Sequence, residues 1–292
     1  MLNMIATEHK SERRITAAAV NEDAAIAGFS GKPPVLSLSI SAEYAGKPRV
    51  LRDLRFEMQP GEILGLVGES GSGKSTLALS ILRLLDLKGG KTSGSVRLNG
   101  RELMTLSESE MRQIRGREIG LVLQSPMSSL NPALKIGTQM YETWRAHKPA
   151  NRKECTLRFL EILRNLNLEV DEKFLDRKPG QLSVGQAQRV LIAMAVLHRP
   201  ALLIADECTS ALDLITQKEV LNIFRQLSQK MGTGILFISH DLLAVSSLCH
   251  RMAILYNGEL VETGLTREIL DRPTHPYTKQ LVGALPVPES IR

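Results

Sequence analysis

Cysteine is scarce in this 292-residue chain, which has three: Cys155, Cys208 and Cys249. They are widely separated, no two have the spacing of paired metal ligands, and an odd number does not suit a disulfide framework. The sequence therefore argues against a cysteine-rich metal or disulfide scaffold. It predicts free thiols in a reducing compartment.

Long apolar runs are also missing. The longest, residues 190–197, is far shorter than the roughly 18 to 20 residues that cross a bilayer. The first residues do not resemble a signal peptide, because the apolar stretch 15–20 that follows Arg13 and Arg14 is too short. We expect a cytoplasmic protein that meets a membrane only through partners or through its surface.

Aromatic residues make up only 4% of the chain, although its net charge is +6. Basic residues gather at 112–117 and 145–153, but aromatic residues are not interleaved with them. A platform for single-stranded nucleic acid needs such aromatics for stacking. We therefore interpret the basic clusters as solvated faces and expect no nucleic-acid partner.

Hydrophobic residues make up 43% of the chain, and their pattern along the sequence predicts an α/β fold. Alternating or short apolar runs predict strands at residues 35–39, 50–56, 62–67, 95–98, 119–123, 201–205 and 234–238. The Asn257-Gly258 turn predicts a hairpin of residues 252–256 and 259–263. A helix is expected over residues 76–85.

Two segments fall outside this pattern. Residues 1–34 are polar and irregular, which predicts a flexible lead-in. From about residue 127 to 198, leucines recur at helical spacing and no strand pattern interrupts them. The sequence therefore predicts a helical subdomain inserted between two strands.

A glycine-rich motif follows the strand at 62–67. Residues 68–75 match G-x-x-x-x-G-K-[ST], in which glycines let the loop curl and present its backbone N–H groups to phosphates. Lys74 would contact the β- and γ-phosphates, and the Ser75 hydroxyl would bind Mg²⁺. A chance Gly/Ser loop is the alternative, but the lysine, the hydroxyl and the strand-loop-helix context oppose it. The nucleotide-binding residues expected here are Gly68, Glu69, Ser70, Gly71, Ser72, Gly73, Lys74, Ser75 and Thr76.

Two acids end the buried strand at 201–205. Asp206 and Glu207 could simply mark the point where the strand reaches solvent. Beside a complete phosphate-binding loop, a site is the better interpretation. Asp206 would hold Mg²⁺, and Glu207 would act as the general base that polarises the attacking water.

Four further motifs resemble those of the ATP-binding cassette (ABC) transporter ATPases. They are Gln124 at the Q-loop position, residues 182–186 (Leu-Ser-Val-Gly-Gln) in place of the signature LSGGQ, the D-loop at 210–213, and His240 at the switch position. The resemblance runs from about residue 35 to 265. It implies a P-loop NTPase core with a mixed sheet, an ABC-type antiparallel β subdomain and an inserted helical subdomain.

The resemblance narrows at two segments. Residues 124–132 look like the extended Q-loop of the oligopeptide, dipeptide and nickel importer ATPases. Residues 275–286, within an expected extension at 266–292, resemble the C-terminal segment of that subfamily. This implies an importer ATPase on the cytoplasmic face of the inner membrane. Its partners would be two transmembrane permease subunits, a second, related or identical, ABC ATPase subunit and, indirectly, an extracytoplasmic solute-binding protein.

The family resemblance also implies roles for single residues. In a head-to-tail dimer, Ser183, Gly185 and Gln186 would contact an ATP held by the partner subunit. His240 would position the γ-phosphate and water beside Glu207. Gln124 would join Ser75 and Asp206 at Mg²⁺ and take part in catalysis. Tyr44 is the candidate to stack on adenine, and the alternative of an exposed strand aromatic stays open.

The chain departs from the family pattern at three places. Val184 replaces the first signature glycine, and a β-branched residue fits poorly if that position needs a positive φ or close approach to phosphate. We therefore hypothesise that the ATP site completed by this signature is slower than its twin. Cys208 stands where the family usually has proline. Cysteine does not fix φ as proline would, so the backbone is less restricted there. Some relatives carry a cysteine-rich tail after the C-terminal motif that can hold an iron–sulfur cluster. No cysteine follows Cys249 in this sequence, so we expect no cluster.

Two alternatives belong to other functional classes. A soluble ABC ATPase acting on ribosomes or DNA would usually join two cassettes or insert a coiled coil, and the sequence has neither. A degenerate regulatory subunit would bind ATP without turnover. Val184 gives that reading slight support, whereas Glu207 and His240 oppose it.

Overall fold

The computed structural model describes residues 33–46, 49–149 and 151–285. Almost all of the expected lead-in at 1–34, and residues 286–292 of the expected extension, lie outside the described residues. Among the described residues, no helix is both long enough and apolar enough to cross a membrane.

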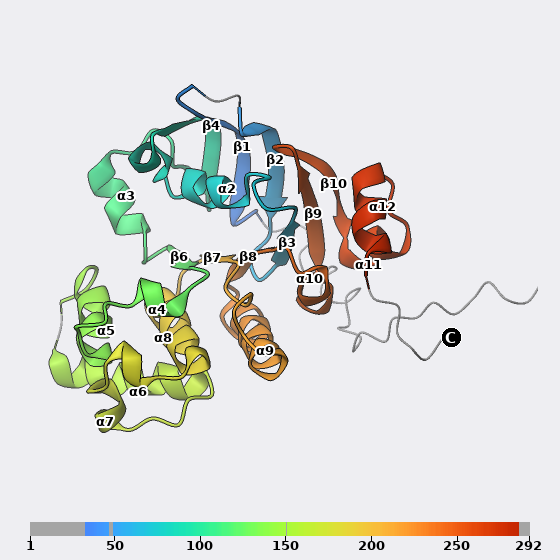
Figure 1. Cartoon of the computed structure of the whole chain (residues 1–292). Coiled ribbons are helices and arrows are strands. Elements are labelled where there is room, and N and C mark those ends of the chain that lie inside the picture. Colours follow the sequence, from blue (N-terminus) through green and yellow to red (C-terminus); the bar gives the residue numbers. More distant parts are fainter. Residues whose placement is uncertain (1–32, 47–48, 150, 286–292) are drawn as a thin grey trace, which may run out of the picture.

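A six-stranded mixed sheet forms the centre of the molecule (Figure 1). Its order is β10 (Glu259–Leu265), β9 (Arg251–Tyr256), β3 (Ile63–Val67), β8 (Gly234–Ser239), β7 (Leu202–Asp206) and β6 (Ile119–Val122). Only the β9–β10 hairpin is antiparallel. Every residue of β3, β7 and β8 is buried, which explains why these strands are apolar up to a single polar residue at the end of β7 and of β8. The parallel strands direct their carboxyl ends to one edge, where ligands bind in open α/β sheets.

A second, antiparallel sheet has the order β2 (Leu51–Met58), β1 (Leu36–Tyr44), β4 (Gly90–Leu98) and β5 (Arg101–Glu102). Alternate residues of β1 point into the core. Helix α2 (Lys74–Ile81) buries Leu77 and Ile81 in a hydrophobic cluster that includes residues from both sheets. The predicted α/β fold with a mixed sheet and an antiparallel β sheet is confirmed.

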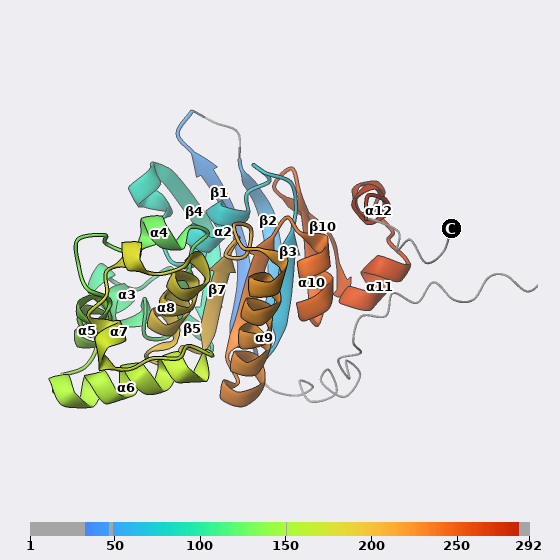
Figure 2. The ribbon, with the colours of Figure 1, turned by 60° about the horizontal axis from the view of Figure 1, so that its bottom comes forward.

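Among the described residues between β6 and β7, helices are the only regular secondary structure. These are α4 (Pro126–Ser129), α5 (Ile136–Arg145), α6 (Arg152–Asn165), α7 (Glu172–Leu175), a short 3₁₀ turn (Pro179–Gln181) and α8 (Val184–Val196). Figures 1 and 2 show them gathered at one side of the sheets. The helices that follow β7 are α9 (Leu214–Met231), α10 (Leu242–Leu248), α11 (Thr266–Asp271) and α12 (Pro276–Gly283).

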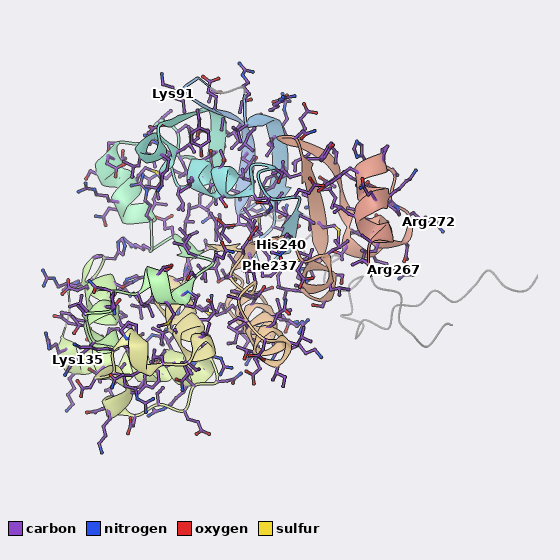
Figure 3. The ribbon with its side chains drawn as sticks, in the orientation of Figure 1. Lys91, Lys135, Phe237, His240, Arg267 and Arg272 are labelled. Carbon is purple, nitrogen blue, oxygen red and sulfur yellow. The ribbon has the colours of Figure 1, made fainter. Side chains whose placement is uncertain are left out.

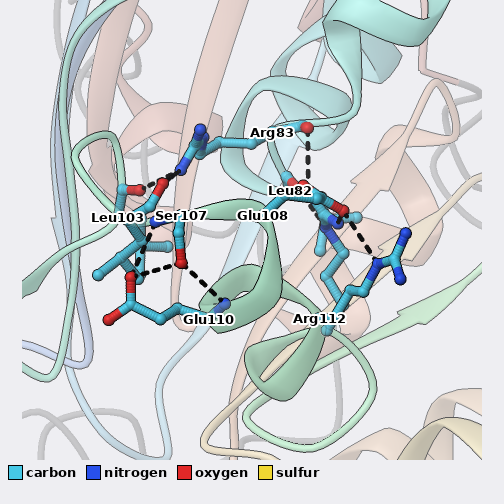
Figure 4. Close-up of polar contacts among 9 residues, drawn as sticks. Leu82, Arg83, Leu103, Ser107, Glu108, Glu110 and Arg112 are labelled. Carbon is cyan, nitrogen blue, oxygen red and sulfur yellow. Dashed lines mark hydrogen bonds and ion pairs between the residues drawn. The ribbon is translucent and has the colours of Figure 1, made fainter.

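Three local expectations need correction. The helix expected over 76–85 is α2, which ends at Ile81; Arg83 has a φ of 51° and a 3₁₀ turn (Leu85–Lys88) follows. Strand β4 begins at Gly90 rather than at Ser95. Helix α3 (Glu108–Ile114) was not predicted, although Ser107 and Glu110 form a capping box at its start (Figure 4).

Candidate nucleotide-binding site

The loop between β3 and α2 is held in a tight curve. Gly71 and Gly73 have φ values of 84° and 109°, in the left-handed region that favours glycine. A Cβ on Gly68 would lie 2.3 Å from the Leu255 carbonyl oxygen, and one on Gly73 would lie 2.5 Å from Leu51 Cδ2. Backbone conformation therefore requires glycine at 71, space requires it at 68, and both require it at 73.

Lys74 is buried at the centre of this loop. Its Nζ donates hydrogen bonds to the carbonyl oxygens of Gly68 and Glu69, both at 2.8 Å. The same Nζ lies 3.6 Å from Glu207 Oε1. The lysine therefore connects the loop after β3 to the carboxylate after β7, and the predicted meeting of these two motifs takes place.

Asp206, the last residue of β7, lies beside the start of α2. Burial raises the pKa of its carboxyl; a hydrogen bond with the Ser75 side chain opposes this, the neighbouring Glu207 adds to it, and Lys74 lowers it. Its Oδ1 is buried without a hydrogen-bond partner among the described residues. A buried carboxylate oxygen with free acceptor capacity, next to a serine hydroxyl, suits a hard cation such as Mg²⁺.

Glu207 adopts a backbone conformation that the sequence did not predict. Its φ is 46°, uncommon for a residue with a side chain, and its N–H donates to the Ile238 carbonyl at 2.9 Å. The carboxylate lies between two cations or potential cations, Lys74 and His240, whose Nδ1 is 3.5 Å from Oε2. Figure 3 shows His240 near the middle of the molecule, close to Phe237 of β8. A positive φ at a residue with a side chain, as at Glu207, is typical of functional positions.

Gln124, after β6, reaches the same edge through the D-loop. Its Nε2 donates to Ser210 Oγ at 3.3 Å, and that hydroxyl donates to the Glu207 carbonyl at 2.9 Å. A cavity of about 350 Å³ opens beside these residues. Its lining is Thr209, Ser210, Leu212, Gln217, Ser239, His240 and Asp241.

The signature residues form the start of α8. Ser183 and Gln186 make a reciprocal capping box, with Ser183 Oγ 3.2 Å from the Gln186 nitrogen. Among the described residues, no hydrogen bond or ion pair joins them to the phosphate-binding loop. A Cβ on Gly185 would lie 2.7 Å from Thr216 Cγ2 of α9, so that glycine is explained within this chain alone.

Val184 is the first residue of α8 and its side chain is 44% exposed. Its backbone is right-handed helical, so the concern that position 184 needs a positive φ is wrong. Only its exposed bulk distinguishes it from glycine. Cys208, at the other departure from the family pattern, is fully buried, and burial raises the pKa of its thiol.

Tyr44, the last residue of β1, lies next to α2. Its hydroxyl is 3.3 Å from Thr76 Oγ1, and the side chain is partly buried. This places the ring beside the phosphate-binding loop rather than on a remote strand edge. Its stacking on adenine stays a prediction.

Tyr277 was missed as a residue of this site. The sequence marked residues 275–278 only as a resemblance, yet the Tyr277 hydroxyl accepts a hydrogen bond from the Glu69 N–H. No periodicity or spacing relates two positions so far apart in the chain.

Comparison with known proteins agrees with this geometry. The ABC transporter family matches residues 51–210. The oligopeptide transport ATP-binding protein OppD of Bacillus subtilis is 41% identical over 258 residues, which cover 88% of this chain and 72% of OppD. A putative peptide import ATP-binding protein of Brucella abortus is 42% identical over 257 residues, covering 87% and 77% of the two chains.

A solved structure is similar as well. The ATP-binding cassette MJ0796, described as a dimer in a post-hydrolysis state bound to ADP and phosphate, superposes with a TM-score of 0.68. It is 28% identical and the match covers 80% of this chain and 99% of MJ0796. The matched family, the two relatives and the convergence of Lys74, Asp206 and Glu207 agree: the chain belongs to the ABC transporter family and is one of its ATP-binding ATPase subunits.

Proposed function

We propose that the chain hydrolyses MgATP to drive an importer for peptides, nickel or a related solute. One observation carries the proposal: four side chains from three separate segments of the chain, Lys74, the adjacent pair Asp206 and Glu207, and His240, converge at one edge of the sheet. The names of the relatives, which refer to oligopeptide transport and peptide import, support the transport part.

Mg²⁺ fits the oxygen atoms present. Ser75 Oγ, Asp206 and Gln124 would hold it, the carboxylate directly or through water. When bound, the ion would neutralise charge on the phosphate oxygens. Binding of Mg²⁺ would also offset the free-energy cost of burying the charge of Asp206, since that carboxylate has an oxygen without a hydrogen-bond partner among the described residues.

The protein groups divide the remaining work. Backbone N–H groups of residues 70–76 and the Lys74 ammonium bind the phosphates, and the N-terminus of α2 adds its positive end. Glu207 accepts a proton from the attacking water. His240, whose Nδ1 already lies beside Glu207, orients that carboxylate and the γ-phosphate.

The signature at the start of α8 would serve a neighbouring ATPase subunit. Ser183, Gly185 and Gln186 lie at a partly exposed helix start, and among the described residues no hydrogen bond or ion pair joins them to this chain's own phosphate-binding loop. A head-to-tail dimer would place them against the partner's ATP. The dimeric state named for MJ0796 supports this arrangement.

The remaining partners follow from the importer assignment. Two transmembrane permease subunits would anchor the chain to the cytoplasmic face of the membrane. The segment 124–132 would receive a permease helix, and a solute-binding protein would act from the other side. The domain boundaries at about 35, 127, 198 and 265 are part of the same proposal.

Affinity purification of the tagged chain from its native cells tests the function. We expect two hydrophobic permease subunits and a second ATPase to copurify, and ATP hydrolysis by the complex to depend on Lys74. Copurification with ribosomes or DNA, without permeases, would favour the soluble ABC ATPase instead. If the chain copurifies with permeases but neither Lys74→Ala nor Glu207→Gln changes ATP hydrolysis by the complex, the result would favour a regulatory subunit.

A further inference from the structure

The C-terminal helix α12 contacts the phosphate-binding loop through Tyr277. The Tyr277 hydroxyl accepts a hydrogen bond from the backbone N–H of Glu69 at 3.1 Å. Glu69 is the second residue of the loop motif and lies 208 positions earlier in the chain. The tyrosine side chain is nearly inaccessible, with 5% of the residue exposed.

The peptide group between Gly68 and Glu69 is held from both sides. Its carbonyl oxygen accepts from Lys74 Nζ at 2.8 Å, and its N–H donates to Tyr277. The described residues contain no cis peptide bond, and in a trans peptide the C=O and N–H point in opposite directions. Lys74 and Tyr277 together therefore fix the rotation of this peptide plane.

The ring of Tyr277 is itself held in place. It stacks on Tyr256 at the end of β9, with ring centroids 4.2 Å apart and planes at 25°. His275 caps the helix, since its Nδ1 accepts from the Tyr277 N–H at 3.2 Å, and Pro276 suits the first helical position. The sequence His-Pro-Tyr thus consists of a cap, a helix start and a buried ring.

Glu262 of β10 fastens the segment that precedes the helix. Its carboxylate accepts from the N–H groups of Thr274 at 2.8 Å and His275 at 3.0 Å. Burial acts to raise the pKa of Glu262, but the nearby Thr278 hydroxyl and the hydrogen bonds from these backbone groups outweigh it and lower the pKa. The hydroxyl of Tyr277 is therefore delivered to the loop by a fixed support and not by a free tail.

We propose that Tyr277 is a positioning residue for the phosphate-binding loop: its hydroxyl orients the Gly68–Glu69 peptide, and thereby Lys74, for the triphosphate. The inference rests on the proposed nucleotide site and gives the C-terminal helix a part in ATP affinity. Tyr277 does not touch the nucleotide, and it acts on binding rather than on the proton transfer at Glu207.

The test is Tyr277→Phe in the full chain assembled with its partners. Removing one hydroxyl keeps the stacked ring and deletes one hydrogen bond. We expect the KM for ATP and the Kd for ADP to rise about three- to tenfold, the usual effect of one such bond. We expect kcat to stay within about twofold and the thermal midpoint without nucleotide to fall by no more than a few degrees, the effect of losing one hydrogen bond.

Tyr256→Phe is the matched control. It removes a hydroxyl from the other ring of the same stack, and that hydroxyl has no hydrogen-bond partner among the described residues. We expect wild-type nucleotide affinity. Lys74→Ala in the same preparation reports on the site itself and should abolish binding.

Three results would overturn the inference. Nucleotide affinity of Tyr277→Phe within twofold of wild type would show that the hydroxyl does not position the loop. Equal losses in the Tyr277 and Tyr256 variants, or a fall in the thermal midpoint much larger than the loss of one hydrogen bond predicts, would assign the effect to packing. In each case an intact Lys74 dependence would leave the proposed function standing, whereas a wild-type chain that binds no nucleotide would remove both.

Discussion

Lys74 and Glu207 form an ion pair across the site, with Nζ 3.6 Å from Oε1. The pair is sheltered, since the Lys74 side chain is 5% and the Glu207 side chain 21% exposed. A phosphate that takes the place of Glu207 beside Lys74 would leave the carboxylate free to face a water molecule. Nucleotide binding and activation of the base are therefore linked through one cation.

The first prediction concerns Glu207. Glu207→Gln keeps the size of the side chain and the constraint on its left-handed backbone, but it removes the proton acceptor. We expect this site to retain ATP and its hydrolysis to fall at least about 100-fold. Single-turnover phosphate release, with the second ATPase subunit disabled, measures it.

Glu259→Gln is the control for this change, because Glu259 is an exposed carboxylate paired with Arg52 in a surface hairpin. It should leave hydrolysis unchanged. Near-normal steady hydrolysis by Glu207→Gln at this site would reject Glu207 as the base.

The second prediction concerns Val184. Its backbone is helical, so any effect on the partner's ATP site comes from its exposed bulk. Val184→Gly should therefore raise turnover of the assembled complex, and Val184→Ala should do so too, because both remove the γ-methyl groups while alanine keeps the helix propensity. Unchanged turnover in both variants would refute the hypothesis of a slow site.

The third prediction concerns the packing of Gly185 against α9. Gly185→Ala would bring its Cβ to 2.7 Å from Thr216 Cγ2, so either the start of α8 shifts or the Thr216 side chain moves and strains its hydrogen bond to Asp213. We expect a loss of roughly 1–3 kcal/mol in unfolding free energy and a fall in turnover of the assembled complex.

Thr216→Ser tests the cause directly. Serine lacks Cγ2 but keeps a hydroxyl that can donate to Asp213, as Thr216 Oγ1 does at 2.7 Å. The double variant should recover most of the stability lost by Gly185→Ala, measured by chemical denaturation. No recovery would mean that the clash is not the reason for glycine at this position.

The sequence predicted those parts of the site that lie at strand ends. Parallel strands share an edge, so a loop after β3, acids after β7 and a histidine after β8 had to meet. Glu207 shows the limit of that reasoning, because its φ of 46° depends on the Ile238 carbonyl of a neighbouring strand. Tyr277 shows it again, since its contact with Glu69 arises from tertiary packing alone.

The fold shows the same division. Apolar runs located the buried strands, but the polar start of β4 gave no strand pattern and is recruited by pairing along the full length of β1. Helix α3 did carry a local signal, the capping residues Ser107 and Glu110. The end of α2 carried none, because arginine at position 83 does not indicate the left-handed backbone conformation that it adopts.

The fourth prediction uses the raised pKa of Asp206. A carboxyl whose pKa is higher in the folded than in the unfolded chain binds more protons when folded, so its contribution to stability falls as pH rises through the folded pKa. Without nucleotide, Asp206→Asn should therefore be more stable than wild type at pH 7 to 8. We expect a higher thermal midpoint for the variant than for wild type under these conditions.

The advantage of Asp206→Asn should shrink as pH is lowered toward the unfolded pKa of about 3.9, because wild-type Asp206 is then protonated as well. With MgATP the order should reverse, since wild type gains stability from ligand binding and the variant loses a metal ligand. Differential scanning calorimetry across pH, with and without MgATP, measures both effects. A variant that is less stable than wild type at every pH without nucleotide would show that the Asp206 charge is compensated inside the apo protein.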